Sequence, residues 1–442
     1  MNAPLQPKGL SLRVNFRWVF LSQLVYLASQ WAILSSLTKL SDLKTVGLFG
    51  LALAITAPIN FGLSLGLRQA QASDVNDQYI FSQYIGLRSL ASIILVLACI
   101  IGVAIFNNSS AAIIVVGLYA VAKAIETYSD TTYGLFQKYE RMDLAARSMI
   151  IRGLGALGFF LGLFYLAGTR DAEALAAGII GICLAWLAVL LCHDLPTAKR
   201  LLATMGHHAP EAGKQRPGAQ SIRPTWNLSK IAPLFWHSLP LGISAFLIAL
   251  QLNIPRYFIE WRLGGEALGY FTPMIFILSA GSQFINPLVR AAVPRLARHF
   301  AARRFSAFIQ LIGKVAAFAA FCGLAAFLVA FFLGAELLTL LYSAEYAKME
   351  SVFALLMAAG ILRYAASALQ MATVAARRFR TQLAQQIGVL SASFAAGYLL
   401  IGPSGLIGAG WAVLAGAACH FLIVLGGMIW SLRSAKLQGP ST

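Results

Sequence analysis

Charged side chains interrupt two long apolar stretches of this chain, one in each half. The first stretch carries Lys123, Glu126 and Asp130 at three- and four-residue spacing, so a helix places them on one face. The second carries Arg363 and contains no acidic residue. A cation inside an apolar helix can bind an anion, and a carboxylate in the same setting can take up a proton or a cation. Both stretches therefore carry candidate functional groups.

Two interpretations of Lys123 stay open. In one, Lys123 pairs with Glu126 a helical turn away, while Arg363 reaches the membrane surface or bonds to carbonyl groups. In the other, Lys123 and Arg363 bind an anion that crosses between the two halves. Because a charge at mid-membrane costs at least a few kcal/mol and Arg363 has no acid nearby in sequence to offset it, anion binding is favoured. Glu126 and Asp130 either neutralise Lys123 or couple transport to a proton or sodium gradient.

A polar face also runs along residues 268–290, an uncharged stretch until its last residue. The polar side chains follow each other at helical spacing: Ser279, Gln283, Asn286 and Arg290. A membrane helix with such a face requires a wet cavity or a partner helix on that side. Gln283, Asn286 and Arg290 are therefore candidate cavity residues.

Composition places the whole chain in a membrane. Of its 442 residues, 59% are hydrophobic and 11% are charged, whereas a soluble domain carries about 25% charge. Such a chain cannot cover itself with a water-facing surface, so we expect an all-α polytopic membrane protein. The net charge of +18 suggests nucleic acid at first sight. The excess of Lys and Arg in loops on one side of the membrane explains it better, so no nucleic acid is expected as a partner.

The apolar runs predict about twelve transmembrane helices in two sets of six. We expect an N-terminal bundle over 1–193, a flexible cytoplasmic linker over 194–230 and a C-terminal bundle over 231–442. On this map, 26 Lys and Arg lie on the side of the termini and the linker, against six on the opposite side. This asymmetry predicts cytoplasmic termini.

The two halves share a weak repeat. The sequence VGLF at 46–49 opens the second span as LGYF at 268–271 opens the eighth, and the same offset carries Arg68 onto Arg290. Six helices per half is an even number, so both copies have one orientation. The predicted fold is therefore two six-helix bundles related by a pseudo-twofold axis along the membrane normal.

No enzymatic constellation is visible. The five cysteines lie in or beside apolar runs without a CxxC pair, so no metal site is predicted. There is no GxxxxGK[ST] loop, so no nucleotide is expected as an energy source. We expect a transporter without a cofactor, driven by an ion gradient.

Several short segments carry a resemblance to a known family: NIPRYFIE at 253–260, LGYF at 268–271, PRLA at 294–297, LYSAEY at 341–346 and PSGLIGAGW at 403–411. They resemble the Wzx-type polysaccharide flippases of the multidrug/oligosaccharidyl-lipid/polysaccharide (MOP) exporter superfamily, from Trp31 to about Trp411. Arg256, which otherwise reads as a solvated loop residue, becomes a candidate through this resemblance.

The resemblance implies a MOP exporter-like fold and an activity. The protein would move undecaprenyl-pyrophosphate-linked oligosaccharide from the cytoplasmic to the periplasmic leaflet of a bacterial inner membrane, for assembly of O-antigen or another surface polysaccharide. The lipid-linked glycan, membrane lipids and the polysaccharide polymerase machinery are the implied partners.

Three other classes fit less well. A drug exporter of the same superfamily would need carboxylates in its cavity for cationic drugs, and acids inside the spans are confined to the stretch around Glu126 and Asp130. A major-facilitator carrier would need a glycine-and-basic loop where residues 68–74 read RQAQASD. A membrane glycosyltransferase or polymerase would need a loop domain or paired catalytic acids, and neither is present.

Overall fold

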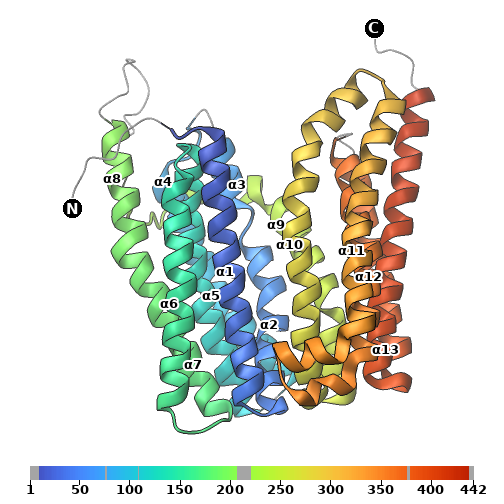
Figure 1. The fold of residues 1–442 in the computed structure, drawn as a ribbon. Coiled ribbons are helices and arrows are strands. Elements are labelled where there is room, and N and C mark those ends of the chain that lie inside the picture. The colour runs from blue at the N-terminus through green and yellow to red at the C-terminus, as the bar shows by residue number, and fades with distance from the viewer. Residues whose placement is uncertain (1–8, 75–76, 108, 207–220, 376–378, 438–442) are drawn as a thin grey trace. The chain divides into compact units, whose positions relative to one another are not determined.

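The computed structural model describes residues 9–74, 77–107, 109–206, 221–375 and 379–437, and these are almost entirely helical (Figure 1). Helices are the expected solution in a bilayer, because every backbone polar group finds its partner within the segment. The elements in chain order are α1 (Leu12–Leu40), α2 (Leu43–Leu63), α3 (Leu67–Ser73), α4 (Phe81–Phe106), α5 (Ser110–Lys138), α6 (Met142–Leu166), α7 (Ala172–Val189), the π-helical turn η1 (Leu190–Asp194), α8 (Leu195–Gly206), α9 (Leu228–Leu263), α10 (Gly265–Ala301), α11 (Phe305–Leu341), the 3₁₀ turn η3 (Ala344–Met349), α12 (Glu350–Ala375) and α13 (Phe379–Leu437).

The chain forms two compact units. The first contains the described residues up to Ser36 together with Ala52–Phe246, and the second contains Leu37–Leu51 and the chain from Leu247 onward. These limits differ from the predicted domain boundaries. The corner between α1 and α2 groups with the second unit, and the start of α9 groups with the first.

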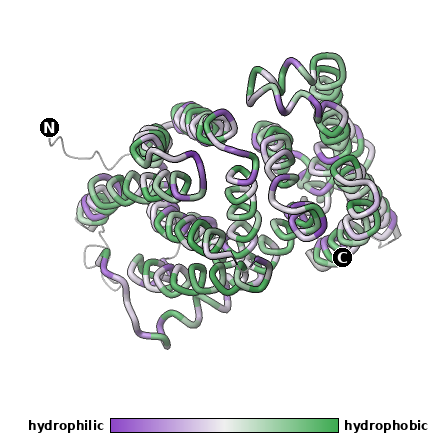
Figure 2. The backbone as a smooth tube through the Cα atoms, turned by 90° about the horizontal axis from the view of Figure 1, so that it is seen from below, coloured by the Kyte–Doolittle hydropathy of each residue, from purple (hydrophilic) through white to green (hydrophobic). Residues whose placement is uncertain are grey.

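Each unit has one central helix. In the first unit α5 packs against α3, α4, α6 and α7, and in the second α12 packs against α10, α11 and α13. Green, hydrophobic residues dominate the long helices of both units (Figure 2). These central helices, α5 and α12, carry Lys123 and Arg363. Both cations therefore start from the helix with the most neighbours in its unit.

A glycine lets α11 and α12 approach closely. A Cβ atom added at Gly323 of α11 would lie 2.6 Å from the Cα of Ile361 on α12, a distance that real Cβ atoms do not reach. Without a hydrophobic driving force between helices in lipid, such close backbone contact is a main source of attraction. It fixes the part of α12 that carries Arg363.

The last helix accounts for two predicted spans. Among the described residues, eleven helical segments are long and apolar enough to cross a membrane, and the last of them extends over Gln382–Ser434. At 1.5 Å per residue its 53 residues would measure roughly 80 Å, far more than one crossing needs. Backbone angles at Gly405 (φ 59°, ψ −141°) break the helix there. The two resulting pieces account for two of the about twelve predicted transmembrane helices.

The predicted flexible linker is wrong at its start. Residues 195–206 form α8, which continues α7 through the π-helical turn η1. The side chains of Ala198, Leu201 and Leu202 are buried in a core with Phe136 of α5. Their three- and four-residue spacing gives one apolar face, a signal that the polar residues between them hide. Residues 207–220 of the predicted linker lie outside the described part of the chain.

The turn before α7 is fixed by a capping residue. Asp171 Oδ1 accepts hydrogen bonds from the Thr169 hydroxyl at 2.9 Å and from the Glu173 backbone N–H at 3.0 Å. The second bond satisfies one of the free N–H groups at the start of α7. Both bonds favour the ionised carboxylate, so the pKa of Asp171 is lowered, first by the Thr169 hydroxyl and then by the backbone of α7.

Candidate functional site

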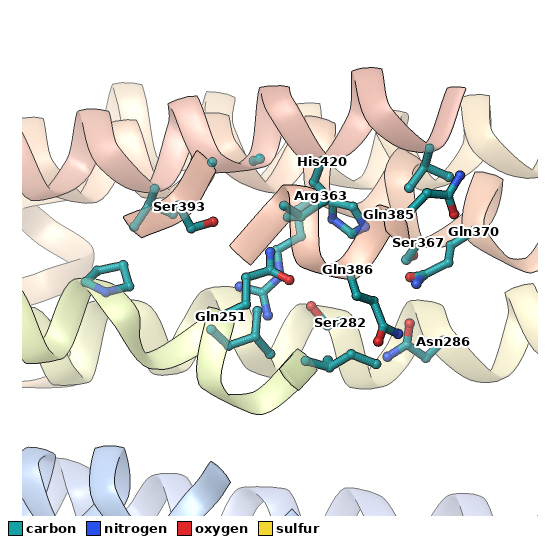
Figure 3. A pocket seen from close by; sticks show the side chains of 18 of the residues that line it. Gln251, Ser282, Asn286, Arg363, Ser367, Gln370, Gln385, Gln386, Ser393 and His420 are labelled. Atoms are coloured by element: carbon teal, nitrogen blue, oxygen red, sulfur yellow. The ribbon is translucent and has the colours of Figure 1, made fainter. Parts of the chain in front are cut away.

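A polar cavity lies within the second unit, around the central helix α12. Its volume is about 270 Å³, and its walls come from α9, α10, α12 and α13. The polar side chains that line it are labelled in Figure 3: Gln251, Ser282, Asn286, Arg363, Ser367, Gln370, Gln385, Gln386, Ser393 and His420. A polar pocket in an otherwise apolar bundle is the setting predicted for a hydrophilic cargo.

The cavity carries one fixed positive charge. Arg363 lines it, and no Asp or Glu is among the described lining residues. Among the ion pairs of the described chain none involves Arg363, and the ionisable side chains that act on it electrostatically are Tyr364 and His420. The Tyr364 hydroxyl is not bonded to Arg363, because it donates to the Leu278 carbonyl at 2.9 Å. The Arg363 guanidinium is thus available to an anion that enters the cavity.

Two adjacent glutamines of α13 add polar atoms without partners. Gln386 is 5% exposed, and neither its Nε2 nor its Oε1 has a hydrogen-bond partner in the described structure. Gln385 Nε2 donates weakly to the Ile423 carbonyl at 3.5 Å, while its Oε1 has no partner. Each buried polar group left in this state costs about 1–3 kcal/mol. A ligand or ordered water bound in the cavity would offset that cost.

The predicted polar face of α10 contributes only in part. Asn286 lines the cavity, whereas Gln283 is exposed outside it. Arg290 lies in α10, and its side chain is outside the described part. Arg256, in α9, does not line the cavity; its Nη1 donates to Asn253 Oδ1 at 2.6 Å. Asn286 is therefore the predicted residue of this group that the structure brings together with Arg363.

In the first unit Lys123 is already paired. Its Nζ lies 2.7 Å from Glu126 Oε2, which is the first of the two interpretations left open by the sequence. Glu126 Oε1 also accepts from the Tyr26 hydroxyl at 2.7 Å and lies 3.3 Å from Arg152 Nη2. The carboxylate therefore has two cations and a hydroxyl, and Lys123 has its counter-charge one turn away.

Arg152 of α6 is the residue that the sequence analysis missed in this cluster. Its side chain is 4% exposed, and its guanidinium lies 5.3 Å from the ring centre of Tyr26, 5.5 Å from Tyr133 and 5.4 Å from Trp186. Aromatic faces attract a desolvated cation. Its signal in the sequence is a cation inside the helix α6, which begins ten residues earlier at Met142.

Asp130, the second ion-coupling candidate, is also paired. Arg68 Nη1 lies 3.1 Å from its Oδ1, and the two side chains are 27% and 38% exposed. Arg68 Nε further donates to Gln137 at 3.2 Å. The described part of the chain holds no group of three or more His, Cys, Asp or Glu residues that could hold a metal ion.

Lys123 and Arg363 thus occupy equivalent helices in different surroundings. The acid at Glu126 compensates Lys123, and in the described part of α12 no acid compensates Arg363. Among the cavity residues missed by the sequence analysis are Gln385, Gln386 and His420 of α13. The signal was present as an amide pair and a lone histidine inside apolar runs, but sequence alone does not show which helix faces them.

Comparison with solved structures defines the class. The lipid II flippase MurJ in an inward closed conformation superposes with a TM-score of 0.69, at 11% identity, over 96% of this chain and 90% of that one. An inward-facing multidrug resistance MATE family transporter of the MOP superfamily gives 0.68, at 12% identity, over 95% and 96%. This likeness shows the fold, and it confirms the predicted all-α, polytopic, MOP exporter-like architecture.

Sequence comparison then gives the family. Residues 15–300 match the family described as polysaccharide biosynthesis protein. The capsular polysaccharide biosynthesis protein CapF of Staphylococcus aureus is 25% identical over 349 residues, which cover 79% of this chain and 81% of CapF. The chain belongs to the polysaccharide biosynthesis protein family, as the resemblance predicted, and is a multi-pass membrane protein.

Proposed function

We propose that this protein is a flippase for a lipid-linked oligosaccharide. Its cargo would be a glycan on undecaprenyl pyrophosphate, moved from the cytoplasmic to the periplasmic leaflet of a bacterial inner membrane for O-antigen or another surface polysaccharide. One observation carries the proposal beyond the family: a membrane-embedded cavity lined by ten polar side chains, with Arg363 as its fixed charge and no carboxylate among its described walls.

The physical problem matches this cavity. A glycan head is covered in hydroxyl groups, and stripping them of water without replacement hydrogen bonds is costly in lipid. Amides and hydroxyls on four helices supply replacements. The lipid tail needs no such site, because it can stay in the bilayer. An outward step of the negative pyrophosphate is also helped by the membrane potential, by roughly 2.3 kcal/mol per charge per 100 mV.

Alternating access of the two six-helix halves around the cargo is the mechanism that we infer, without ATP and with a proton or sodium gradient as the energy source. Glu126 and Asp130 remain the proposed coupling residues. Each carries a cation partner, so an incoming proton or sodium ion would have to displace Lys123, Arg152 or Arg68. Cytoplasmic termini and contact with the polymerase machinery belong to the same proposal.

Export of a cationic drug is the alternative suggested by the multidrug transporters of this fold. A cationic cargo needs a carboxylate to offset its desolvation. The described walls of the second-unit cavity offer Arg363 instead. This electrostatic difference favours the glycan cargo.

Reconstituted protein tests the proposal. Purified full-length chain in liposomes, under an ion gradient or potential and without ATP, should move undecaprenyl-pyrophosphate-linked oligosaccharide to the opposite leaflet. Accessibility of the glycan to a sugar-specific oxidase or lectin outside the vesicle reports the movement. A matched liposome with Arg363→Ala protein is the control. Movement that requires ATP hydrolysis, or none at all with folded protein, would refute the proposal.

A further inference from the structure

The chemistry of the cavity walls in the second unit is more specific than its polarity. Five of the ten polar side chains are primary amides: Gln251, Asn286, Gln370, Gln385 and Gln386. An amide presents two donors and an acceptor oxygen, so a wall of amides fits a ligand that both donates and accepts. Hydroxyl groups do both, whereas a fully ionised phosphate only accepts.

The amide atoms of Gln385 and Gln386 that have no hydrogen-bond partner also call for a ligand that both donates and accepts. Gln386 has a free donor, Nε2, and a free acceptor, Oε1, and Gln385 has a free acceptor, Oε1. Figure 3 shows these side chains at the cavity around Arg363. The two acceptor oxygens need donors that pyrophosphate does not have. Neighbouring hydroxyl groups on a sugar ring would satisfy all three atoms.

The charge in the cavity calls for one anionic group. Arg363 has no carboxylate partner among the described residues, and its planar guanidinium matches a carboxylate with two parallel hydrogen bonds. A pyrophosphate carries at least two charges and would leave part of its charge uncompensated beside a single arginine. A sugar carboxylate matches the single charge.

The volume limits the ligand to a single ring. At about 270 Å³ the cavity is just below the roughly 300–1,000 Å³ of pockets that enclose drug-sized ligands. It is also far larger than one water, whose share of liquid volume is about 30 Å³. One monosaccharide residue of a longer glycan is the unit that such a space encloses.

We infer that this cavity is a recognition subsite for one acidic sugar of the uronic-acid class. Arg363 binds the ring carboxylate, Gln385 and Gln386 bind ring hydroxyls, and Asn286 of α10 lines the same subsite. The inference rests on the proposed function for its role in transport, and it places the pyrophosphate of the cargo elsewhere. The subsite selects which glycan is accepted.

Direct binding tests this assignment without transport. Full-length protein in nanodiscs is titrated with D-glucuronate, the uncharged D-glucuronamide, D-glucose and inorganic pyrophosphate, with calorimetry or ligand-observed NMR as the readout. For a ligand of this size we expect a dissociation constant on the order of 1 mM for glucuronate. The uncharged sugars should bind about tenfold more weakly, since they lack the charged hydrogen bonds to Arg363.

Variants separate the two parts of the subsite. Arg363→Gln should remove the preference for glucuronate over glucuronamide and leave weak binding of both. Gln386→Leu should weaken both sugars to a similar degree, about tenfold. Gln283→Leu is the matched control, because Gln283 is an exposed glutamine of α10 outside the cavity, and it should bind like the unmodified protein.

Three results would overturn the inference: equal binding of glucuronate and glucuronamide, displacement of glucuronate by pyrophosphate at lower concentration, or unchanged binding by folded Arg363→Gln protein. The outcome is separable from the proposed function. Arg363-dependent glucuronate binding by a protein that flips no lipid-linked glycan would keep the subsite and refute the flippase. Flipping of lipid-linked glycan by a protein that binds glucuronate and glucuronamide equally would keep the flippase and refute the subsite.

Discussion

The pairing of Lys123 with Glu126 leads to a prediction about which of the two residues the first unit depends on more. Removing one partner of a buried ion pair costs about 3–5 kcal/mol when the remaining charge has no other partner. Glu126 has other partners, because the Tyr26 hydroxyl and Arg152 also contact it. Lys123→Ala should therefore cost less, about 1–2 kcal/mol, which is the range of a single charged hydrogen bond.

Substitution of the acidic partner, Glu126, should cost more stability than substitution of Lys123. Glu126→Gln removes the ion-pair partner of both Lys123 and Arg152, whose side chains are 19% and 4% exposed. We expect the full cost of about 3–5 kcal/mol. The double variant Lys123→Ala with Glu126→Gln keeps one cation instead of two. It should be more stable than Glu126→Gln alone, with a coupling energy of about 1–3 kcal/mol.

The assay is the fraction of protein that stays folded after heating in detergent, followed by size-exclusion chromatography of a fluorescent fusion. Membrane abundance and glycan export are measured for the same variants. Tyr26→Phe, which removes only the hydroxyl on Glu126, is a mild control. If Lys123→Ala is as destabilising as Glu126→Gln, the three-partner description of Glu126 is wrong. If Lys123→Ala abolishes export at normal stability, Lys123 serves cargo despite its pairing.

Four more outcomes are expected. Arg363→Ala should abolish export at normal abundance, since it removes the fixed charge of the cavity, and Arg363→Lys should keep part of it; full export by the Ala variant would rule out cargo binding there. Ser229→Cys, in a chain without native cysteines, should not react with an impermeant thiol reagent applied outside intact cells, because we expect this segment to be cytoplasmic. Strong labelling would contradict the proposed topology. Gly323→Leu should cost about 1–3 kcal/mol because its side chain meets the backbone of Ile361, whereas normal thermal stability would deny the close helix contact. The lowered pKa of Asp171 means that its cap stabilises α7 above the ordinary aspartate pKa and that this contribution is lost as the pH falls through the lower folded-state value; hydrogen exchange at the start of α7 should show this loss, and Asp171→Asn should remove the pH dependence.

Periodicity and hydropathy were sufficient for the membrane fold. The apolar runs gave the spans, and the three-residue step from Lys123 to Glu126 gave the ion pair as one of two interpretations. Both are local properties of one helix. The same reasoning could not find the contact of Arg152 with Glu126, which joins residues 26 positions apart on two helices.

The cavity was harder to predict for the same reason. Arg363 stood out because a lone charge in an apolar run is conspicuous in any sequence. Gln386 and His420, which line the same cavity, lie on α13 on either side of the break at Gly405. Only the packing of α13 against α12 brings them to Arg363. The sequence analysis also missed the helix α8 at the start of the predicted linker. Polar residues between its apolar positions hid the face that includes the buried Leu201.

The unequal surroundings of the two central cations have a practical consequence for protein engineering. In the first unit, a substitution at Glu126 removes the ion-pair partner of both Lys123 and Arg152, so we expect most variants at this position to lose stability. The cavity of the second unit contains amide atoms without hydrogen-bond partners, and replacing Gln385 or Gln386 with another polar residue disturbs no ion pair of the described chain. A search for variants that accept a different surface sugar should therefore randomise α13 around these two positions and leave α5 untouched.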